Sequence, residues 1–475
     1  MKRLLLFLTI FCLTATVSGQ IDRTKKPAPK AVAPLTLPKI QRASLANGLS
    51  IMLVEHHEMP VVQCQLVLKS GSTQDPKGKS GLANLTAQLM DEGTTKRSAL
   101  QVADDLDFIG ANLSVSAAQD AMFASLLTIK EHLTSALDVY ADVVLNPSFP
   151  EEEWNRVKKT HLASLMARKD QPAFVASSVF DILTYGVEHP YGQPSGGTEA
   201  TVNAISVDDL KSFYNTYFKP NNGTLIIVGD VTMKEMKPMV EKYFGSWKKG
   251  SVSQPKFPAA PTIASTQIYL VDKPQAAQSE IRIGQVGVAR NTDDYYAITV
   301  MNTILGGQFS SRINLNLRES KGYTYGARSS FAMQKEAGPF VASAAVKTSV
   351  TDSSVIEFMK ELRGIRDADV TQKEFEFAVN SIVRRQPQGF ETPGQIAGQL
   401  MSLVLYDLPD DYFNTSIQNI EKVTVKDVRR VAQKYLDPKA MNIVIVGDVA
   451  TIKDGLEKLG YGAVHGVSAD GQMMH

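Results

Sequence analysis

Two stretches of the chain decide its fold, because they repeat one pattern. Residues 206–231 read SVDDLKSFYNTYFKPNNGTLIIVGDV, and residues 424–449 read TVKDVRRVAQKYLDPKAMNIVIVGDV, a constant 218 residues apart with no gap. Each stretch starts with Ser or Thr followed by Asp three residues later, a pattern typical of a helix start. A helix, a proline and an apolar strand that ends in Val-Gly-Asp-Val follow. Two unrelated helix–strand units are the alternative, but the constant spacing favours an internal repeat.

The repeat indicates two homologous halves, and the patterns around it indicate their class. Residues 49–57 and 61–71 alternate apolar and polar side chains and are predicted to be paired strands, with two more strands within residues 112–129. Helical patterns occupy four stretches, residues 80–90, 99–111, 131–145 and 150–169. Because strands and helices do not alternate regularly, we predict an α+β fold in which each half is a mostly antiparallel sheet with helices packed on one face.

Composition marks the segments that flank the two halves. The first residues combine Lys2 and Arg3 with a mostly apolar run that is too short to span a bilayer, a pattern typical of a secretory signal peptide, with a retained anchor as the alternative. Proline and lysine dominate the next segment, and proline, serine and alanine dominate a second breakpoint near the middle of the chain. The predicted organisation is a signal peptide (1–19), a leader (20–40), an N-terminal half (41–249), a linker (250–265), a C-terminal half (266–462) and a tail (463–475).

Charge and cysteine content exclude some classes of function. The 475 residues have a net charge of +1 and no block of lysine or arginine, so neither nucleic acid nor a membrane surface is an expected partner. Removal of the signal would leave Cys64 as the single cysteine, so an internal disulfide is excluded and Cys64 is expected to pack in a strand as a small apolar residue. An exported protein without disulfides fits a bacterial periplasm.

Residues 80–98, SGLANLTAQLMDEGTTKRS, have the pattern of a metallopeptidase helix without its histidines. Side chains four residues apart on a helix share a face, which lets two histidines bind one zinc ion beside a carboxylate. Here that spacing falls on Asn84 and Gln88, whose neutral amides are poor zinc ligands. Ala87 stands where an inverted motif has its general base and cannot accept a proton. The seven histidines of the chain are not arranged to replace these ligands, so we expect no zinc chemistry in this half.

At family level, residues 71–98, GSTQDPKGKSGLANLTAQLMDEGTTKRS, resemble the segment with the inverted zinc motif in the insulinase (pitrilysin) metallopeptidase family. That family includes mitochondrial processing peptidases and many secreted bacterial homologues. The resemblance runs from about residue 40 to about residue 460 and includes PSFPEEEWNRVKKTHLASLMARKDQP, HPYGQPSGGTEATV and the two-half repeat. It implies that the two histidines of the family fall on Asn84 and Gln88, its catalytic glutamate on Ala87, and its third ligand on or beside Ser164. It also implies that the two halves enclose a chamber.

A second candidate site lies in residues 302–331, NTILGGQFSSRINLNLRESKGYTYGARSSF. Two glycines, Gly306 and Gly307, are predicted to break one helix, and a second helix is predicted over about residues 308–319. Gly322 is predicted to end that second helix. A strand is predicted to begin near Tyr325.

The family resemblance implies a role for Arg318 and Tyr325 in this segment. An arginine and a tyrosine seven residues apart are thought to bind the scissile carbonyl in that family. Arginine offers a fixed fork of donors that stays charged, and tyrosine offers one O–H. The structural alternatives are an arginine that binds the last carbonyls of its helix and a tyrosine that only packs. Tyr323, two residues earlier, remains an alternative to Tyr325.

The resemblance and the altered motif together lead to a functional hypothesis. We expect a noncatalytic, substrate-binding subunit of a two-chain zinc endopeptidase, a pseudoenzyme that binds no cofactor itself. A zinc-bearing family member would be its partner, and unfolded peptides, bound by strand addition to a sheet edge, would be the substrate. A peptide-binding or scaffolding homodimer without proteolytic activity is the alternative, and an autonomous metallopeptidase is the third possibility. The segment LGGQFSSR is too short to match the glycine-rich loop of noncatalytic processing subunits, so presequence handling is not expected.

Overall fold

The computed structural model describes residues 39–474, which lie within one compact unit of residues 36–475. The predicted signal peptide and all but the last two residues of the predicted leader therefore lie outside the described residues. Within the described range, no helix combines the length and the apolar character that crossing a membrane requires.

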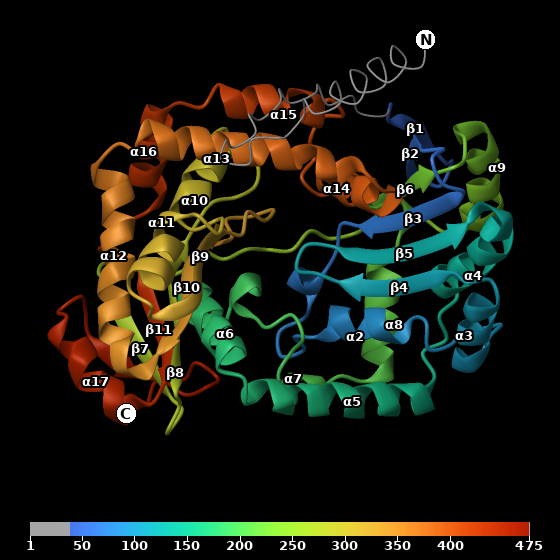
Figure 1. Ribbon diagram of the computed structural model, residues 1–475. Helices are drawn as coiled ribbons and strands as arrows, with labels where there is room; N and C mark the ends of the chain where they lie inside the picture. Colours follow the sequence, from blue (N-terminus) through green and yellow to red (C-terminus); the bar gives the residue numbers. More distant parts are fainter. Residues whose placement is uncertain (1–38, 475) are drawn as a thin grey trace, which may run out of the picture. The chain divides into compact units, whose positions relative to one another are not determined.

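The first sheet of the described residues has six strands, and β4 lies at one of its edges (Figure 1). Its pairings are antiparallel except for that of β2 with β6. In spatial order the strands are β1 (Gln41–Ser44), β2 (Ser50–Glu55), β6 (Gly223–Gly229), β3 (Val61–Leu68), β5 (Met122–Ile129) and β4 (Asn112–Ala117).

One prediction about this sheet is wrong. The strands predicted within residues 49–57 and 61–71 form, as β2 and β3, but they do not pair with each other. Strand β6 lies between them, parallel to β2 and antiparallel to β3. Its apolar side chains are buried on both faces of the sheet, which suits an interior position rather than an edge.

Helices cover one face of the first sheet and share a single apolar core with it. The four helical predictions are confirmed, with ends that move by up to three residues. The covering helices are α2 (Leu82–Leu89), α3 (Ala99–Phe108), α4 (Leu133–Leu145), α5 (Glu151–Lys169), α7 (Glu199–Asn203), α8 (Val207–Tyr217) and α9 (Met233–Phe244).

The second sheet of the described residues repeats the design of the first. In spatial order its strands are β12 (Val464–Gly466), β7 (Gln267–Asp272), β11 (Asn442–Gly447), β8 (Gln278–Val286), β10 (Pro339–Lys347) and β9 (Thr324–Phe331). From β7 to β9 this order matches β2, β6, β3, β5 and β4 of the first sheet. The helices of this half are α10 (Tyr295–Leu305), α11 (Arg312–Asn314), α12 (Thr351–Asp367), α13 (Gln372–Arg385), α14 (Pro393–Leu405), α15 (Tyr412–Glu421), α16 (Val425–Tyr435) and α17 (Val449–Lys458). The predicted fold of two homologous α+β halves is confirmed.

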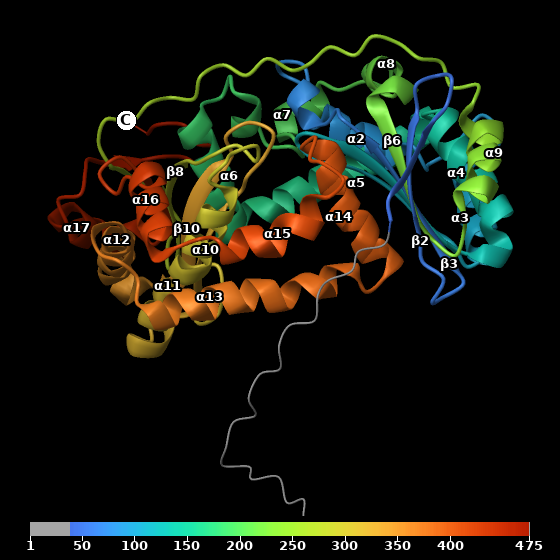
Figure 2. The ribbon, with the colours of Figure 1, turned by 90° about the horizontal axis from the view of Figure 1, so that it is seen from above.

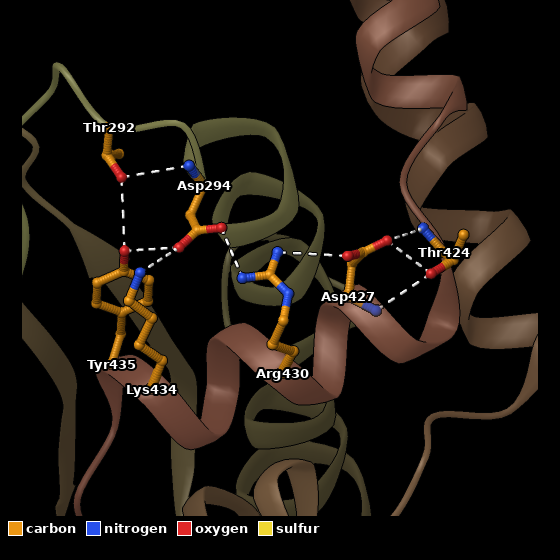
Figure 3. Close-up of polar contacts among 7 residues, drawn as sticks. All are labelled: Thr292, Asp294, Thr424, Asp427, Arg430, Lys434 and Tyr435. Atoms are coloured by element: carbon orange, nitrogen blue, oxygen red, sulfur yellow. Dashed lines mark hydrogen bonds and ion pairs between the residues drawn. The ribbon is translucent and has the colours of Figure 1, made fainter.

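The helix-capping pattern of the repeat, Ser or Thr followed three residues later by Asp, forms in both copies. Ser206 accepts a hydrogen bond from the backbone N–H of Asp209, whose carboxylate accepts one from the N–H of Ser206 at 2.9 Å. Thr424 and Asp427 make the same pair of bonds at the start of α16 (Figure 3). These reciprocal bonds satisfy donors that a helix start leaves free, which explains why the sequence pattern located both helices.

Each sheet also receives one helix from the other half of the sequence. Helix α14 packs on the second face of the first sheet, where Ile396 and Leu400 join a core with Met52 and Val67 (Figures 1 and 2). Helix α6 (Pro172–Tyr185) packs on β8 and β11 of the second sheet. This exchange joins the two halves through apolar burial.

Candidate functional site

The helix that lacks its histidines is held firmly in place. Gly81, which has a positive φ of 97°, caps the start of helix α2. The Asp75 carboxylate accepts hydrogen bonds from the N–H groups of Gly81 and Ala83, both at 2.8 Å. A carboxylate at this end of a helix satisfies free donors and complements the helix dipole. The leucines of α2 are buried in the first core, so its exposed face keeps a fixed orientation.

Asn84 and Gln88 lie on that face and contact each other. Gln88 Nε2 donates a hydrogen bond to Asn84 Oδ1 at 2.6 Å. Ala87 differs from them, because it is completely buried and its methyl group belongs to the core of the first half. The structure therefore brings the two amides together and places Ala87 away from them.

The two amides line a cavity of about 580 Å³ between α2, α5 and the edge strand β4. Ser164 of α5 lines the same cavity, whereas the next residue, Leu165, is buried in the core. The family resemblance implies a third ligand position on or beside Ser164, and the structure places Ser164 at the cavity.

The residues of this cavity do not fit a zinc ion. Two amides and a hydroxyl replace the imidazoles and carboxylate that zinc prefers. His161 also lines the cavity, but its Nε2 lies 2.7 Å from the backbone oxygen of Gly196. Among residues 39–474, no group of three or more His, Cys, Asp or Glu side chains could hold a metal. We therefore derive no metal chemistry from this half.

Two other side chains of this half, Cys64 and His57, are buried or hydrogen-bonded. Cys64 is a free, buried cysteine in β3, as predicted, and burial raises the pKa of its thiol to about 12. His57 lies beyond the end of β2, with Nδ1 2.6 Å from Asp230 and Nε2 3.2 Å from Glu55. The bond with the Asp230 carboxylate, followed by that with Glu55, raises the pKa of His57.

The second candidate site begins with a chain segment that is only partly the predicted helix. Instead of one helix over residues 308–319, a short α11 (Arg312–Asn314) is followed by a π-helical turn, η5 (Leu315–Ser320). Asn314 Nδ2 donates to the backbone oxygen of Phe309 at 2.6 Å and so holds the preceding residues outside the helix. Gly322 has a positive φ of 63°, and the predicted end of the helical segment at this glycine is confirmed.

An ion pair anchors the start of this segment. Arg312 Nε and Nη2 donate to the Glu374 carboxylate of α13 at 2.6 and 2.9 Å. These bonds from Arg312 lower the pKa of Glu374 to about 2. The π-helical turn therefore follows a point that is tied to a neighbouring helix.

Arg318 lies in the π-helical turn, and its guanidinium stacks on a phenylalanine. The guanidinium carbon is 4.3 Å from the centre of the Phe309 ring, and Nε is 3.6 Å from a carboxylate oxygen of Glu319. Nη1 of Arg318 is buried and has no hydrogen-bond partner within residues 39–474. These contacts do not match the structural alternative, in which Arg318 would bind the last backbone carbonyls of its own helix. Phe309 had no signal in the sequence, because a single phenylalanine in a turn fits no motif.

Tyr325 lies on a β-bulge at the start of the edge strand β9. Thr324 pairs with Val346 and Ala327 with Ala344, so β9 carries one extra residue at this point. A bulge bends the strand and redirects its side chains, and Tyr325 is 93% exposed. Tyr323 precedes the strand and is half-buried, and its backbone N–H donates to Leu317 O at 2.9 Å.

A second cavity, of about 470 Å³, lies beside the bulge. Phe309 lines it together with Gly326, Arg328 and, from β8, Arg282. Arg282 is tied to Glu280 at 2.9 Å. Arg318 and Tyr325 themselves do not line this cavity, but Phe309 and Gly326 of the same segment do.

Two family models match this chain, and together they cover most of the described residues. The model described as "Insulinase (Peptidase family M16)" matches residues 50–185, and the model described as "Peptidase M16 inactive domain" matches residues 204–382. The chain belongs to the insulinase family, peptidase family M16. The family resemblance inferred from the sequence is confirmed.

Relatives and solved structures agree with this assignment. The chain is 25% identical over 338 residues to the "Uncharacterized zinc protease YmxG" of Bacillus subtilis, which covers 71% of this chain and 81% of that protein. An "Uncharacterized zinc protease" of Mycobacterium leprae is 25% identical over 417 residues, or 87% of this chain and 92% of that protein. A crystal structure of a "peptidase M16 inactive domain" from Pseudomonas fluorescens superposes with a TM-score of 0.81 at 27% identity, covering 86% of this chain and 98% of that one. A Helicobacter pylori protease at 21% identity, also with a TM-score of 0.81 and covering 87% of this chain and 100% of that one, shows the shared fold.

Proposed function

We propose that this chain is the noncatalytic, substrate-binding subunit of a two-chain insulinase-family zinc endopeptidase. A partner chain would carry the zinc ion and the general base, and this chain would supply Arg318 and Tyr325. One contrast carries the proposal. The zinc-motif positions Asn84, Ala87, Gln88 and Ser164 have no metal ligand. Within residues 39–474, by contrast, Arg318 Nη1 has no hydrogen-bond partner and Tyr325 is 93% exposed.

The proposed task of the pair is to bind the carbonyl oxygen of the scissile peptide as negative charge grows on it. Arg318 offers charged N–H donors and lies over the Phe309 ring, and Tyr325 offers its O–H from the bulge. Donors held in place before the reaction lose little by reorganising, and each such donor contributes about 3 kcal/mol in well-studied enzymes. The two side chains would therefore stabilise the transition state without forming or breaking a bond themselves.

Exposed apolar side chains near Arg318 and Tyr325 support the proposal that a partner chain binds over this surface. Phe309 is 65% exposed, Leu315 is 43% exposed and Tyr325 is 93% exposed, all within one short stretch of sequence. Large exposed apolar groups that lie close together are typical of surfaces that bind another molecule. A partner that brought its metal site to Arg318 would also remove these side chains from water.

Peptides in extended conformation are the proposed substrate class. Strands β4 and β9 each end their sheet in the described part of the chain, and an edge strand presents backbone groups that an added peptide strand can pair with. The names of the relatives from Bacillus subtilis and Mycobacterium leprae also indicate proteolysis as the reaction class. The periplasm is the proposed location, on the basis of the signal-like residues 1–19.

The test begins with identification of the partner. Mass spectrometry of proteins that copurify with the native chain should find a zinc-bearing family member, and coexpression should then yield an active complex. Arg318→Ala in this chain should lower kcat/KM of the complex about 100-fold. Arg363→Ala is the control, because Arg363 is another arginine beside an aromatic ring: its guanidinium carbon lies 5.4 Å from the centre of the Tyr461 ring.

Two outcomes would count against the proposal. If Arg318→Ala leaves kcat/KM of the complex within a factor of three, the pair does not act on the transition state. If the chain purifies as a homodimer with no protease, the scaffolding alternative is correct.

A further inference from the structure

We propose that the cavity at Asn84 and Gln88 is a second peptide site, in which the two amides bind one backbone amide group of an extended peptide without cutting it. The ligand class rests on the proposed function, but the site itself does not depend on Arg318 or Tyr325. It would convert the position of a lost metal centre into a point of attachment for substrate.

The two side-chain amides leave the hydrogen-bonding groups that a peptide unit requires. Each amide has one oxygen acceptor and two N–H donors. The bond from Gln88 Nε2 to Asn84 Oδ1 leaves Gln88 Oε1 and the Asn84 NH₂ group without a further hydrogen bond to residues 39–474. A peptide N–H can donate to the free oxygen while its neighbouring C=O accepts from the free NH₂. If the N and O atoms of both side-chain amides are exchanged, the pair still has one free oxygen acceptor and one free NH₂ group.

The pair is also arranged in advance. Asn84 and Gln88 are four residues apart on α2, so their side chains lie above one another. Their mutual bond at 2.6 Å restricts both rotamers, which reduces the side-chain entropy lost when a ligand binds. The buried start of α2, bound to Asp75, fixes the helix that presents them.

An edge strand borders the same cavity. Leu113, Ser114 and Val115 of β4 line it opposite the amides, and β4 is the last strand of its sheet in the described residues. A peptide that adds to β4 would satisfy the outer backbone groups of that strand. The amides would then bind a peptide unit that β4 does not reach.

The charges of the cavity suit a neutral ligand. Its lining holds two acids and two arginines, Asp91, Glu92, Arg156 and Arg168. Arg156 forms ion pairs with Glu92 and with Glu153, and Arg168 lies 5.7 Å from the centre of the Phe174 ring. The four charges balance, and Arg156 and Glu92 are paired. The set therefore gives no advantage to a phosphate or a metal ion, but it accepts an uncharged peptide backbone.

Peptide binding to the purified full chain tests the proposal. The probe is a fluorescein-labelled, unstructured twelve-residue peptide of Ser, Thr, Ala and Gln, followed by fluorescence anisotropy. Gln88→Leu removes the internal bond and the free acceptor, and should weaken binding about tenfold, the effect of one to two hydrogen bonds. The control is Gln372→Leu, because Gln372 is also an exposed helical glutamine, which donates to Glu376 four residues later at 2.9 Å.

A second probe asks whether the backbone is what the site binds. The same peptide with alternate backbone nitrogens methylated should bind the wild-type chain at least tenfold more weakly, because it has lost N–H donors. Asn84→Asp keeps an acceptor for Gln88 but removes the donors of Asn84, and should also weaken the unmethylated peptide.

The outcomes separate this inference from the proposed function. Absence of binding to the wild type, equal binding of the methylated peptide, or less than a twofold effect of both Gln88→Leu and Asn84→Asp would overturn it. Arg318 lies outside the cavity lining, and this binding is measured on the chain alone, without a partner or catalysis. A failure of the Arg318 test in the complex would therefore leave the peptide site standing.

Discussion

The guanidinium carbon of Arg318 lies 4.3 Å from the centre of the Phe309 ring, although Phe309 itself is 65% exposed. An exposed phenylalanine contributes little to a core, so stability does not explain its position. A planar guanidinium on an aromatic face is limited to few orientations. The relationship indicates that Phe309 acts on function through the arginine, as a positioning residue.

Phe309→Ala should therefore lower kcat/KM of the two-chain complex about tenfold, with most of the effect in kcat, because the freed arginine loses its orientation toward the transition state. The free energy of unfolding should change by less than about 1 kcal/mol, the range of exposed cation–π contacts. Phe377→Ala is the control, since Phe377 is 52% exposed on α13. A fall in stability that matches the fall in activity would argue for a purely structural role.

A restored zinc site is a second prediction. The triple variant Asn84→His, Gln88→His, Ser164→Glu should bind one equivalent of zinc, because the three positions line one cavity and would present two imidazoles and a carboxylate. Metal analysis after dialysis measures the effect, with the wild-type chain and the double variant lacking Ser164→Glu as controls. Zinc content equal to that of the wild type would show that these positions do not match the ligands of the family.

Addition of Ala87→Glu to that triple variant should destabilise the protein. The Ala87 methyl group is completely buried in the core of the first half, and a carboxylate placed there loses its hydration without a partner. We expect a loss of several kcal/mol in the free energy of unfolding, measured in urea. The control is Ala103→Glu on the exposed side of α3, which should be close to neutral. A quadruple variant as stable as the triple one would mean that the helix can rotate to present residue 87.

The parts of the fold that sequence predicted are those with local causes. Reciprocal caps such as Ser206 with Asp209 are set by neighbours three residues apart, and the constant spacing of the two copies made the repeat visible. The position of β6 between β2 and β3 has no such signal. The apolar pattern of a strand does not specify which of several strands far apart in sequence it pairs with. The exchange of α6 and α14 between the sheets is hidden for the same reason.

In the candidate sites too, the sequence predicted what depends on residue type and not what depends on tertiary contacts. Residue types alone showed that Asn84 and Gln88 cannot replace histidines, and the structure adds that they bind each other. The π-helical turn at Arg318 follows an ion pair of Arg312 with the distant Glu374. The helical pattern of the sequence does not contain that contact, so it predicted an ordinary helix instead. Phe309 becomes informative only when its ring is seen beneath the guanidinium.

The exchanged helix α14 should couple the stability of the two halves. Leu400 is 2% exposed and packs with the first sheet, although it follows the second sheet's strands β7 to β10 in sequence. Leu400→Ala should cost about 2–5 kcal/mol of unfolding free energy, the usual range for a buried leucine. Leu100→Ala, at a position that is 70% exposed, should cost less than about 0.5 kcal/mol. Hydrogen exchange should show loss of protection in both sheets of Leu400→Ala; loss confined to the first sheet would contradict the coupling.

Asp294 joins α10 to α16 and should make the C-terminal half sensitive to acid. Its carboxylate accepts hydrogen bonds from Arg430 at 2.7 Å, Lys434 at 2.8 Å and Tyr435 at 2.7 Å (Figure 3). Burial alone would raise the pKa of Asp294, but the bonds from Lys434, Tyr435 and Arg430 outweigh it and lower the pKa to about 2. An unfolded aspartate titrates near about 3.9. The stabilising effect of Asp294 is therefore complete above about pH 4 and is lost as the pH falls toward about 2.

Replacement of this carboxylate should remove both the stability and its pH dependence. Asp294→Asn should lower the free energy of unfolding by about 2 kcal/mol at pH 7, because charge-assisted hydrogen bonds of this kind each contribute about 1.5–3 kcal/mol and Arg430 and Lys434 are half-exposed and recover hydration. Urea unfolding at pH 7 and pH 3 measures the difference, which should shrink at pH 3. Asp104→Asn, at an exposed position of α3, is the control and should change neither value. An Asp294→Asn variant whose deficit is as large at pH 3 as at pH 7 would show that packing of the side chain, and not its charge, holds α10 against α16.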